Sequence, residues 1–438
     1  MTGQTRRAVS RAVCLFALCW AAPGYASPLS WSALTVYTGT DADPNPSISA
    51  NGVDLIAAGF CAATEVDPSV VGYSSIVKFE LSPSYLTGFE GISINASPSL
   101  SGTRPLAMVV PGDITINAPW SQCGANGVTS SGVYQGLTGG PGGVCGGYKG
   151  GDSWPGSGLP GDGPGGGGGG NPSGAGGSLV SSGGAGDGSS ANVATGFPPH
   201  PGKSADPVSD LWAGSGGGGS GATWSLPKYR GSGAGGAGAV GFFCSVDSGS
   251  IVVANSITLG GGNGGSGSKG GGGGGSGGTI ILMSGDQGSV TLAGQLSADG
   301  GAGGYMAGGG AGGEIAVYYG TVLNDFATPT VDGGTGYNDG DAGHYYTEAL
   351  YIPIPGDANL DGTVNLSDFT ILKAHFGQSP ADWPDGDFND DDTVNLSDFT
   401  ILKAHFGESK SAATALPEPA SLSLLAFGAL MAFGRKRK

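Results

Sequence analysis

The chain has 438 residues, of which 93 are glycine and 27 are proline, yet glycine does not recur at every third position, which excludes a collagen triple helix. Only 12% of the residues are charged, and 34 acidic residues against 17 basic ones give a net charge of −17. Because such a chain cannot neutralise a row of phosphates, its composition argues against nucleic acid as a partner.

Residues 1–26 have the features of a secretion signal. Arginines near the start precede an apolar run over 12–22, and small residues precede a cleavage site after Ala26. The run is too short to span the hydrocarbon core of a bilayer, which disfavours a membrane anchor as the alternative. The sequence therefore predicts an exported protein.

The middle of the chain predicts a mainly β fold. Apolar residues in two stretches of 240–352 alternate with small or polar ones, and the stretches lie 39 residues apart: Ile251, Val253, Ile257 and Leu259, then Val290, Leu292, Leu296 and Ala298. Alternation is typical of half-buried strands, and its return at a fixed spacing predicts stacked coils. We therefore expect 240–352 to form a right-handed parallel β-helix-like body. In the general glycine-rich character of its sequence it resembles glycine-rich β-helix proteins of the bacterial surface.

The segments before this body are predicted to belong to it in different ways. Residues 27–120 contain short strand patterns, and the stretch 113–117 looks like a further rung, so we expect them to begin or cap the same body. Residues 121–239 hold the densest glycine and are predicted to be a mostly irregular excursion. A disordered Gly/Ser linker is the alternative.

Four cysteines remain after removal of the signal: Cys61, Cys123, Cys145 and Cys244. An even number of cysteines in an exported chain favours disulfides, with three pairings open. Four free thiols are the alternative.

A 30-residue repeat follows the β body. Residues 363–377 recur identically as 393–407, and an acid-rich loop begins each copy. Oxygen-bearing groups follow an EF-hand-like spacing in both loops: Asp357, Asn359, Asp361, Thr363, Asn365 and Asp368, then Asp387, Asn389, Asp391, Thr393, Asn395 and Asp398. The threonines supply a backbone carbonyl. Calcium takes six to eight oxygen ligands, so the pattern predicts two calcium sites.

Each loop is predicted to lead into one helix. In the first copy, Ser367 gives a polar start, and Phe369, Leu372 and Phe376 fall on one apolar stripe. Gly377 stands where a glycine commonly ends a helix. The second copy repeats this pattern, and prolines just before the first loop exclude a helix there.

One loop and one helix, duplicated over 355–409, resemble the type I dockerin domain. The resemblance implies that the loop residues named above bind two calcium ions and that the helices bind cohesin domains. The second loop departs from the family pattern, because Asp392 stands at the position where Gly362 supplies a positive φ in the first loop. We therefore expect the second calcium site to be the weaker one.

The last segment, 416–438, has the features of a second targeting signal. Pro417, Glu418 and Pro419 precede an apolar run over 420–433 and a basic end. The run would rise about 21 Å as a helix, less than the roughly 30 Å of a hydrocarbon core, which suits a temporary anchor. The segment resembles the PEP-CTERM sorting signal. This implies an exosortase-type processing enzyme as a partner, transient inner-membrane retention, and then the cell surface or extracellular matrix; an ordinary tail anchor is the alternative.

Three functions remain open. Low charge and few histidines favour a non-catalytic structural or adhesive protein of the cell surface or matrix, with an extracellular polysaccharide as a candidate partner. One alternative is a polysaccharide-degrading enzyme, a glycoside hydrolase or lyase, with paired carboxylates among Asp286, Asp299 and Glu314. The other is a scaffold whose dockerin-like module recruits a cohesin-bearing partner. Outside the repeats only His200 and His344 remain, which disfavours a Ser–His–Asp site.

Overall fold

A computed structural model describes residues 27–40, 43–70, 72–129, 137–155, 158–171, 173–187, 207–222, 230–350, 354–359, 361–389 and 391–409. The predicted secretion signal and the predicted sorting motif at Pro417, Glu418 and Pro419 lie outside the described residues. Within them, no helix is both long enough and apolar enough to cross a membrane.

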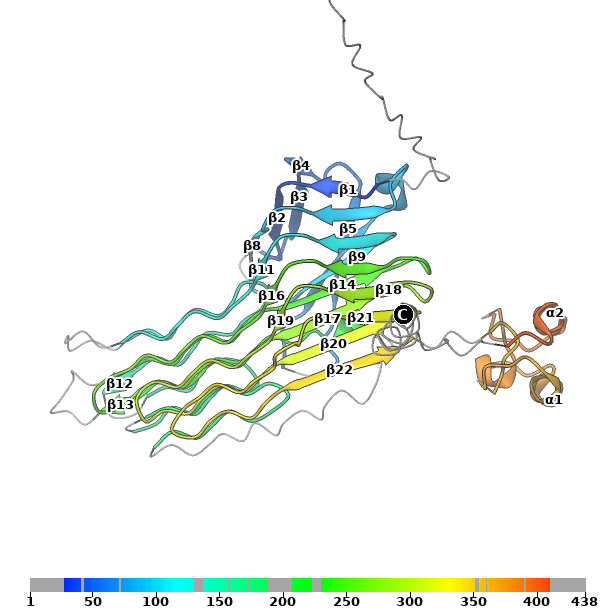
Figure 1. Cartoon of the computed structure of the whole chain (residues 1–438). Helices are drawn as coiled ribbons and strands as arrows, with labels where there is room; N and C mark the ends of the chain where they lie inside the picture. The colour runs from blue at the N-terminus through cyan, green and yellow to red at the C-terminus, as the bar shows by residue number, and fades with distance from the viewer. Residues whose placement is uncertain are drawn as a thin grey trace, which may run out of the picture.

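Two large sheets make up most of the β body (Figure 1). The seven-stranded sheet contains, in spatial order, β22 (His344–Ala349), β20 (Glu314–Tyr319), β17 (Thr279–Met283), β14 (Ala239–Cys244), β9 (Leu106–Val110), β6 (Ile76–Leu81) and β5 (Cys61–Val66). The six-stranded sheet contains β1 (Leu29–Trp31), β7 (Gly91–Ile94), β10 (Asp113–Ile116), β15 (Ile251–Val253), β18 (Ser289–Leu292) and β21 (Val322–Asp325). All pairs are parallel except β5 with β6.

Smaller sheets complete the body. A parallel three-stranded sheet contains β11 (Trp120–Ser121), β16 (Ile257–Thr258) and β19 (Leu296–Ser297). Near the N-terminus, β4 (Val53–Asp54), β3 (Ser47–Ala50), β2 (Leu34–Tyr37) and β8 (Ser99–Ser101) form a fourth sheet. The strands β12 (Trp154–Pro155) and β13 (Gly221–Ala222) pair with each other, and two short 3-10 helices cover Pro83–Leu86 and Pro207–Asp210.

The chain visits the three parallel sheets in the same order in successive circuits. It passes through β9, β10 and β11, then β14, β15 and β16, and then β17, β18 and β19. Ile251 aligns with Val290, and Ile257 aligns with Leu296, so the predicted spacing of 39 residues is confirmed as strand register. The right-handed sense of these circuits stays a prediction.

The alternating apolar residues fill one core between the sheets. Ile251, Val253, Val290 and Leu292 are fully buried, and side chains of the seven-stranded sheet such as Ile280 join the same cluster. The prediction that 113–117 adds a rung is confirmed, because β10 pairs with both β7 and β15. Strands within 27–120 thus join the same two large sheets.

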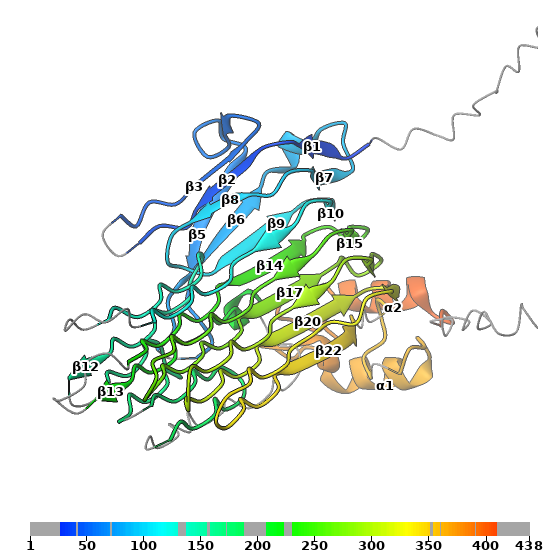
Figure 2. The same cartoon turned by 60° about the vertical axis from the view of Figure 1, so that its left-hand side comes forward.

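The glycine-rich segments extend beyond the strands and pack against one another (Figure 2). Within 272–277, successive backbone N–H groups donate in turn to 262–265, 215–218 and 308–311, and this order repeats after three residues. A strand directs its N–H groups to two sides, whereas an extended helix with three residues per turn directs them to three. The glycine-rich segments thus form a hydrogen-bonded array of extended helices, which we call the glycine array.

Close packing explains why the array is built from glycine. A Cβ atom at Gly261 would overlap the carbonyl oxygen of Gly275, and one at Gly275 would overlap that of Gly235. Most of the described parts of 121–239 belong to this array. The described parts of 121–239 contain few strands, but their backbone groups form regular hydrogen bonds with segments that are distant in the sequence.

The cysteines correct the expectation of disulfides, since all four are free. Cys61 lies on β5 and Cys244 on β14, with β6 and β9 between them. At about 4.8 Å per strand this separates them by about 14 Å, whereas a disulfide needs Cα atoms about 4.4–6.8 Å apart. Burial raises the pKa of the thiols of Cys61, Cys145 and Cys244 to about 12, while Cys123 is exposed.

Candidate metal centre

The repeat forms two helices that pack around a core of their own. The helices are α1 (Leu366–His375) and α2 (Leu396–His405), with a short 3-10 helix at Trp383–Asp385 between them. Leu372 and Leu402 are buried, and the rings of Phe369 and Phe399 meet with centroids 5.9 Å apart. These four side chains belong to one apolar cluster. The whole cluster comes from 354–402, so this segment has the core of an independent unit.

Each helix is capped two residues earlier than the sequence suggested. Asn365 caps α1 by accepting from the backbone N–H of Ser367 at 2.7 Å, and Asn395 does the same for α2. The carboxylate of Asp368 in turn accepts from the N–H of Asn365 at 2.8 Å, which completes a capping box. The polar start predicted at Ser367 is corrected, and the Asn-x-x-Asp spacing was the signal that could have revealed it.

The helix ends follow the prediction in their backbone. Gly377 and Gly407 have φ of 87° and 91°, which confirms their role just beyond each helix. Phe376 lies on the predicted apolar stripe but is 55% exposed. It is the C-cap residue of α1, and it lines a surface groove together with Phe369 and Leu372.

The first loop gathers oxygen atoms around two buried carboxylates. Asp357 and Asp368 are fully buried, although both are acidic. Asp357 accepts from the N–H groups of Asp361 at 3.1 Å and Gly362 at 2.8 Å, and Asp368 accepts from that of Ala358 at 3.0 Å. These bonds hold two carboxylates from the two ends of the loop in one place.

The amide and backbone oxygens of the first loop complete this arrangement. Asn359 donates its Nδ2 to Asp361 Oδ2 at 2.9 Å, and Asn365 donates its Nδ2 to the carbonyl of Thr363 at 3.1 Å. These side chains therefore fold back over the same short loop. The structure thus brings together the six residues predicted as ligands in the first copy.

The second loop repeats the first, with one clearly longer bond. Asp387 and Asp398 are buried, and Asp398 accepts from the N–H of Phe388 at 2.8 Å. The bond from the N–H of Asp391 to Asp387 Oδ1 is 3.4 Å, against 3.1 Å for its counterpart in the first loop. Asn395 donates to the carbonyl of Thr393 at 3.0 Å, so the second set of predicted ligands also comes together.

The donor set of each loop fits a hard cation. In the described residues no three His, Cys, Asp or Glu side chains gather as a metal cluster, because each loop combines its carboxylates with amide and backbone oxygens. Burial of a charged carboxylate is costly unless a counter-charge is near. Asp368 and Asp398 take part in no ion pair among the described residues, so an oxygen-loving cation would supply that charge.

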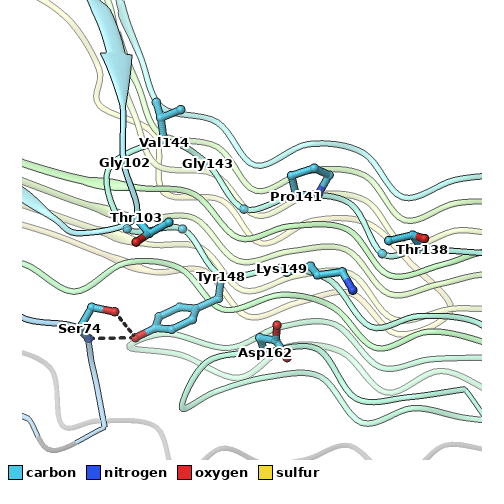
Figure 3. A pocket seen from close by; sticks show the side chains of 14 residues that line it. Ser74, Gly102, Thr103, Thr138, Pro141, Gly143, Val144, Tyr148, Lys149 and Asp162 are labelled. Carbon is cyan, nitrogen blue, oxygen red and sulfur yellow. Dashed lines mark hydrogen bonds between the residues drawn. The ribbon is translucent and has the colours of Figure 1, made fainter. Parts of the chain in front are cut away.

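The glycine array contains a second candidate site (Figure 3). A cavity of about 540 Å³ is walled mostly by glycine backbone, with Tyr148, Lys149 and Asp162 among its polar side chains. The hydroxyl of Tyr148 accepts from the N–H of Ser74 at 3.0 Å, and Lys149 pairs with Asp152 at 2.6 Å. Sequence reasoning missed this cavity, because its walls come from segments far apart in the chain.

The three acids considered for a paired carboxylate site lie in different surroundings. Glu314 is fully buried at the start of β20 beside Thr279, whereas Asp286 follows the far end of β17. Asp299 accepts from the hydroxyls of Ser297 at 2.7 Å and Thr330 at 2.9 Å, as a turn residue does. Asp299 is thus held as a turn residue, and Glu314 is enclosed in the core.

Comparison with known proteins bears on the repeat. Residues 355–407 match the family model of the dockerin type I domain. This segment is a type I dockerin domain. Domains of this type bind calcium and dock onto cohesin domains, which agrees with the loops and helices described above. Searches of the curated proteins and of the solved structures found nothing that matches the chain.

Proposed function

We propose that the protein is an exported, non-catalytic structural or adhesive protein of the cell surface or extracellular matrix, joined through its dockerin domain to a cohesin-bearing partner. The dockerin domain is the observation that carries this proposal, because docking is the function of the type. The glycine array supports a structural role for the body. Its backbone groups bond to one another and leave few polar groups for chemistry.

Each loop of the dockerin domain binds one calcium ion in this proposal. Asp357, Asn359, Asp361, Asn365 and Asp368 hold the first ion with the carbonyl of Thr363. The equivalent residues of the second loop hold the second ion: Asp387, Asn389, Asp391, Thr393, Asn395 and Asp398. Calcium offsets the repulsion among the acids, so its binding and the folding of the loops are coupled.

A polysaccharide-degrading enzyme is the less supported alternative. The cavity near Tyr148 offers an aromatic ring beside polar side chains, which suits a sugar ligand. Yet Asp162 is its only carboxylate among the described lining residues, and glycoside hydrolysis uses two. Polysaccharide therefore fits this body better as a binding partner than as a substrate.

The sorting proposal concerns the two ends of the chain. Secretion followed by exosortase-type cleavage near Pro417–Pro419 would hold the protein at the inner membrane for a time and then release it. Intact mass spectrometry of the extracellular protein tests this step. A mass that lacks Arg435–Lys438 agrees with it, and a mass that retains them contradicts it.

The docking proposal is tested with immobilised cohesin domains of several types. The full chain should bind at least one of them in millimolar calcium and be released by a chelator. An Asp357→Ala/Asp387→Ala variant should lose this binding, because both loops lose a buried ligand. The exposed control Asp247→Asn should bind as the original chain does. Binding that is unchanged in chelator would contradict calcium-dependent docking.

A further inference from the structure

The β body ends in a strand with one open edge. In the described part of the chain, β22 pairs with β20 on one side and is the last strand of the seven-stranded sheet. At the opposite edge of that sheet, β5 carries Glu65, which pairs with Arg104. Charged side chains at an edge disfavour pairing with a further strand. Sheets without such protection at an edge readily accept another strand. The unpaired edge of β22 can therefore accept a further strand.

The two faces of β22 are set by its register with β20. Tyr345 aligns with Ile315 and points inward, where its hydroxyl donates to Asp325 of β21 at 2.7 Å. Tyr346 points outward, and its hydroxyl lies 2.6 Å from that of Tyr318. Because side chains alternate along a strand, His344, Tyr346 and Glu348 share the outer face. Thr347 shares the inner face with Tyr345.

Exposed apolar residues lie at the same end of the body. Val322 on β21 is 45% exposed, and Phe326, just after β21, is 76% exposed. The strand β21 is the last strand of the six-stranded sheet, as β22 is of the seven-stranded one. Exposed apolar side chains beside an open strand edge are features of an interaction surface. This surface does not depend on the dockerin domain.

We propose that β22 pairs with β22 of a second copy of this chain, antiparallel and centred on Tyr346. Such pairing is self-complementary under two-fold symmetry. It places His344 of each copy opposite Glu348 of the other, and Tyr345 opposite Thr347. Each pair lies on one face of the joined sheet, and the histidine meets a carboxylate rather than a like charge. The sequence of β22 thus matches its own reverse, which selects a second copy as the occupant.

A charge exchange tests the pairing. The full chain should show by light scattering a mass twice its 42.5 kDa. His344→Glu places like charges opposite each other, and Glu348→Lys removes the carboxylate that faces His344 of the second copy, so each variant should be monomeric. An equal mixture of the two variants should recover dimers, because opposite charges then meet. A monomeric original chain at all concentrations, or dimers that persist in both single variants, would overturn the pairing.

Cysteine cross-linking gives a second readout if a charge variant fails to fold. In a Cys123→Ser background, Tyr346→Cys should form a disulfide between copies, because directly opposed Cα atoms lie about 4.5–5.5 Å apart. Glu348→Cys alone should not cross-link, whereas His344→Cys combined with Glu348→Cys should. Equal cross-linking of Glu348→Cys and Tyr346→Cys would overturn the proposed register.

Discussion

The two dockerin loops differ in sequence at three positions, 358/388, 360/390 and 362/392, and the third difference creates local backbone strain. Gly362 has φ of 82°, and Asp392 has φ of 60° in the same place. Glycine reaches this region freely, whereas a residue with a Cβ atom does so at a cost of roughly 1–2 kcal/mol, somewhat less for Asp. The loop geometry thus agrees with the expectation that the second site is weaker.

Asp392→Gly should therefore strengthen the second loop. We expect the dockerin domain to unfold with a free energy higher by about 1 kcal/mol and the weaker calcium site to bind roughly fivefold more tightly. Calorimetric calcium titration and thermal unfolding measure the two effects. The reverse change, Gly362→Asp, should weaken the first site. Weaker calcium binding in Asp392→Gly would contradict the strain argument.

Glu314 is a residue whose charge the β body disfavours. Burial, followed by the nearby Asp210 carboxylate, raises the pKa of Glu314 from its ordinary 4.5 to about 8. The folded state then holds a proton that the unfolded state releases, so this contribution to stability is complete below pH 4.5 and is lost as pH rises through about 8.

Glu314→Gln should remove this pH dependence. For the original chain, the free energy of unfolding should fall between pH 4.5 and pH 8 by up to about 1.4 kcal/mol per pH unit from this group. Denaturant unfolding at several pH values measures the slope. The exposed control Asp247→Asn should keep the slope of the original chain. A Glu314→Gln variant with an unchanged slope would show that another group titrates.

The segments of the glycine array act together at the scale of elements. Each one bonds to neighbours on three sides, so the fit of one segment depends on the others. Gly260 and Gly261 offer a matched pair. A Cβ atom at Gly261 would overlap the backbone of Gly275, whereas at Gly260 the nearest atom, the carbonyl oxygen of Asp299, would lie 3.6 Å away.

Gly261→Ala should therefore destabilise the β body by about 1–3 kcal/mol, as overpacking of a close-packed interior does. Gly260→Ala should change its stability by less than about 0.5 kcal/mol. Thermal unfolding of the two variants makes the comparison. Equal melting temperatures for the two variants would contradict the close packing of the array.

The sequence predicted those elements that are determined by residues close together in the chain. The alternation at Ile251–Val253 predicted a strand. The identical repeats predicted the two helices and the glycines just beyond them. The glycine array was missed because each of its bonds joins segments distant in the chain, and glycine alone has no periodicity to read. The free cysteines were missed for the same reason, since only the order of the strands separates Cys61 from Cys244.

At the scale of the whole molecule, two units of different physical character share one chain. Stacked apolar side chains and backbone hydrogen bonds hold the β body together, and neither depends on an ion. The dockerin domain has a small core and buries acidic side chains in both loops. Loss of calcium should therefore unfold the dockerin domain and leave the β body intact.

Calcium titration of the full chain by calorimetry tests the central claim most directly. The original chain should bind two equivalents. Asp357→Ala combined with Asp361→Ala should remove one of them, and adding Asp387→Ala with Asp391→Ala should remove the other. Binding that is absent from the original chain, or that stays at two equivalents in these variants, would contradict the account of the protein as a calcium-dependent docking protein.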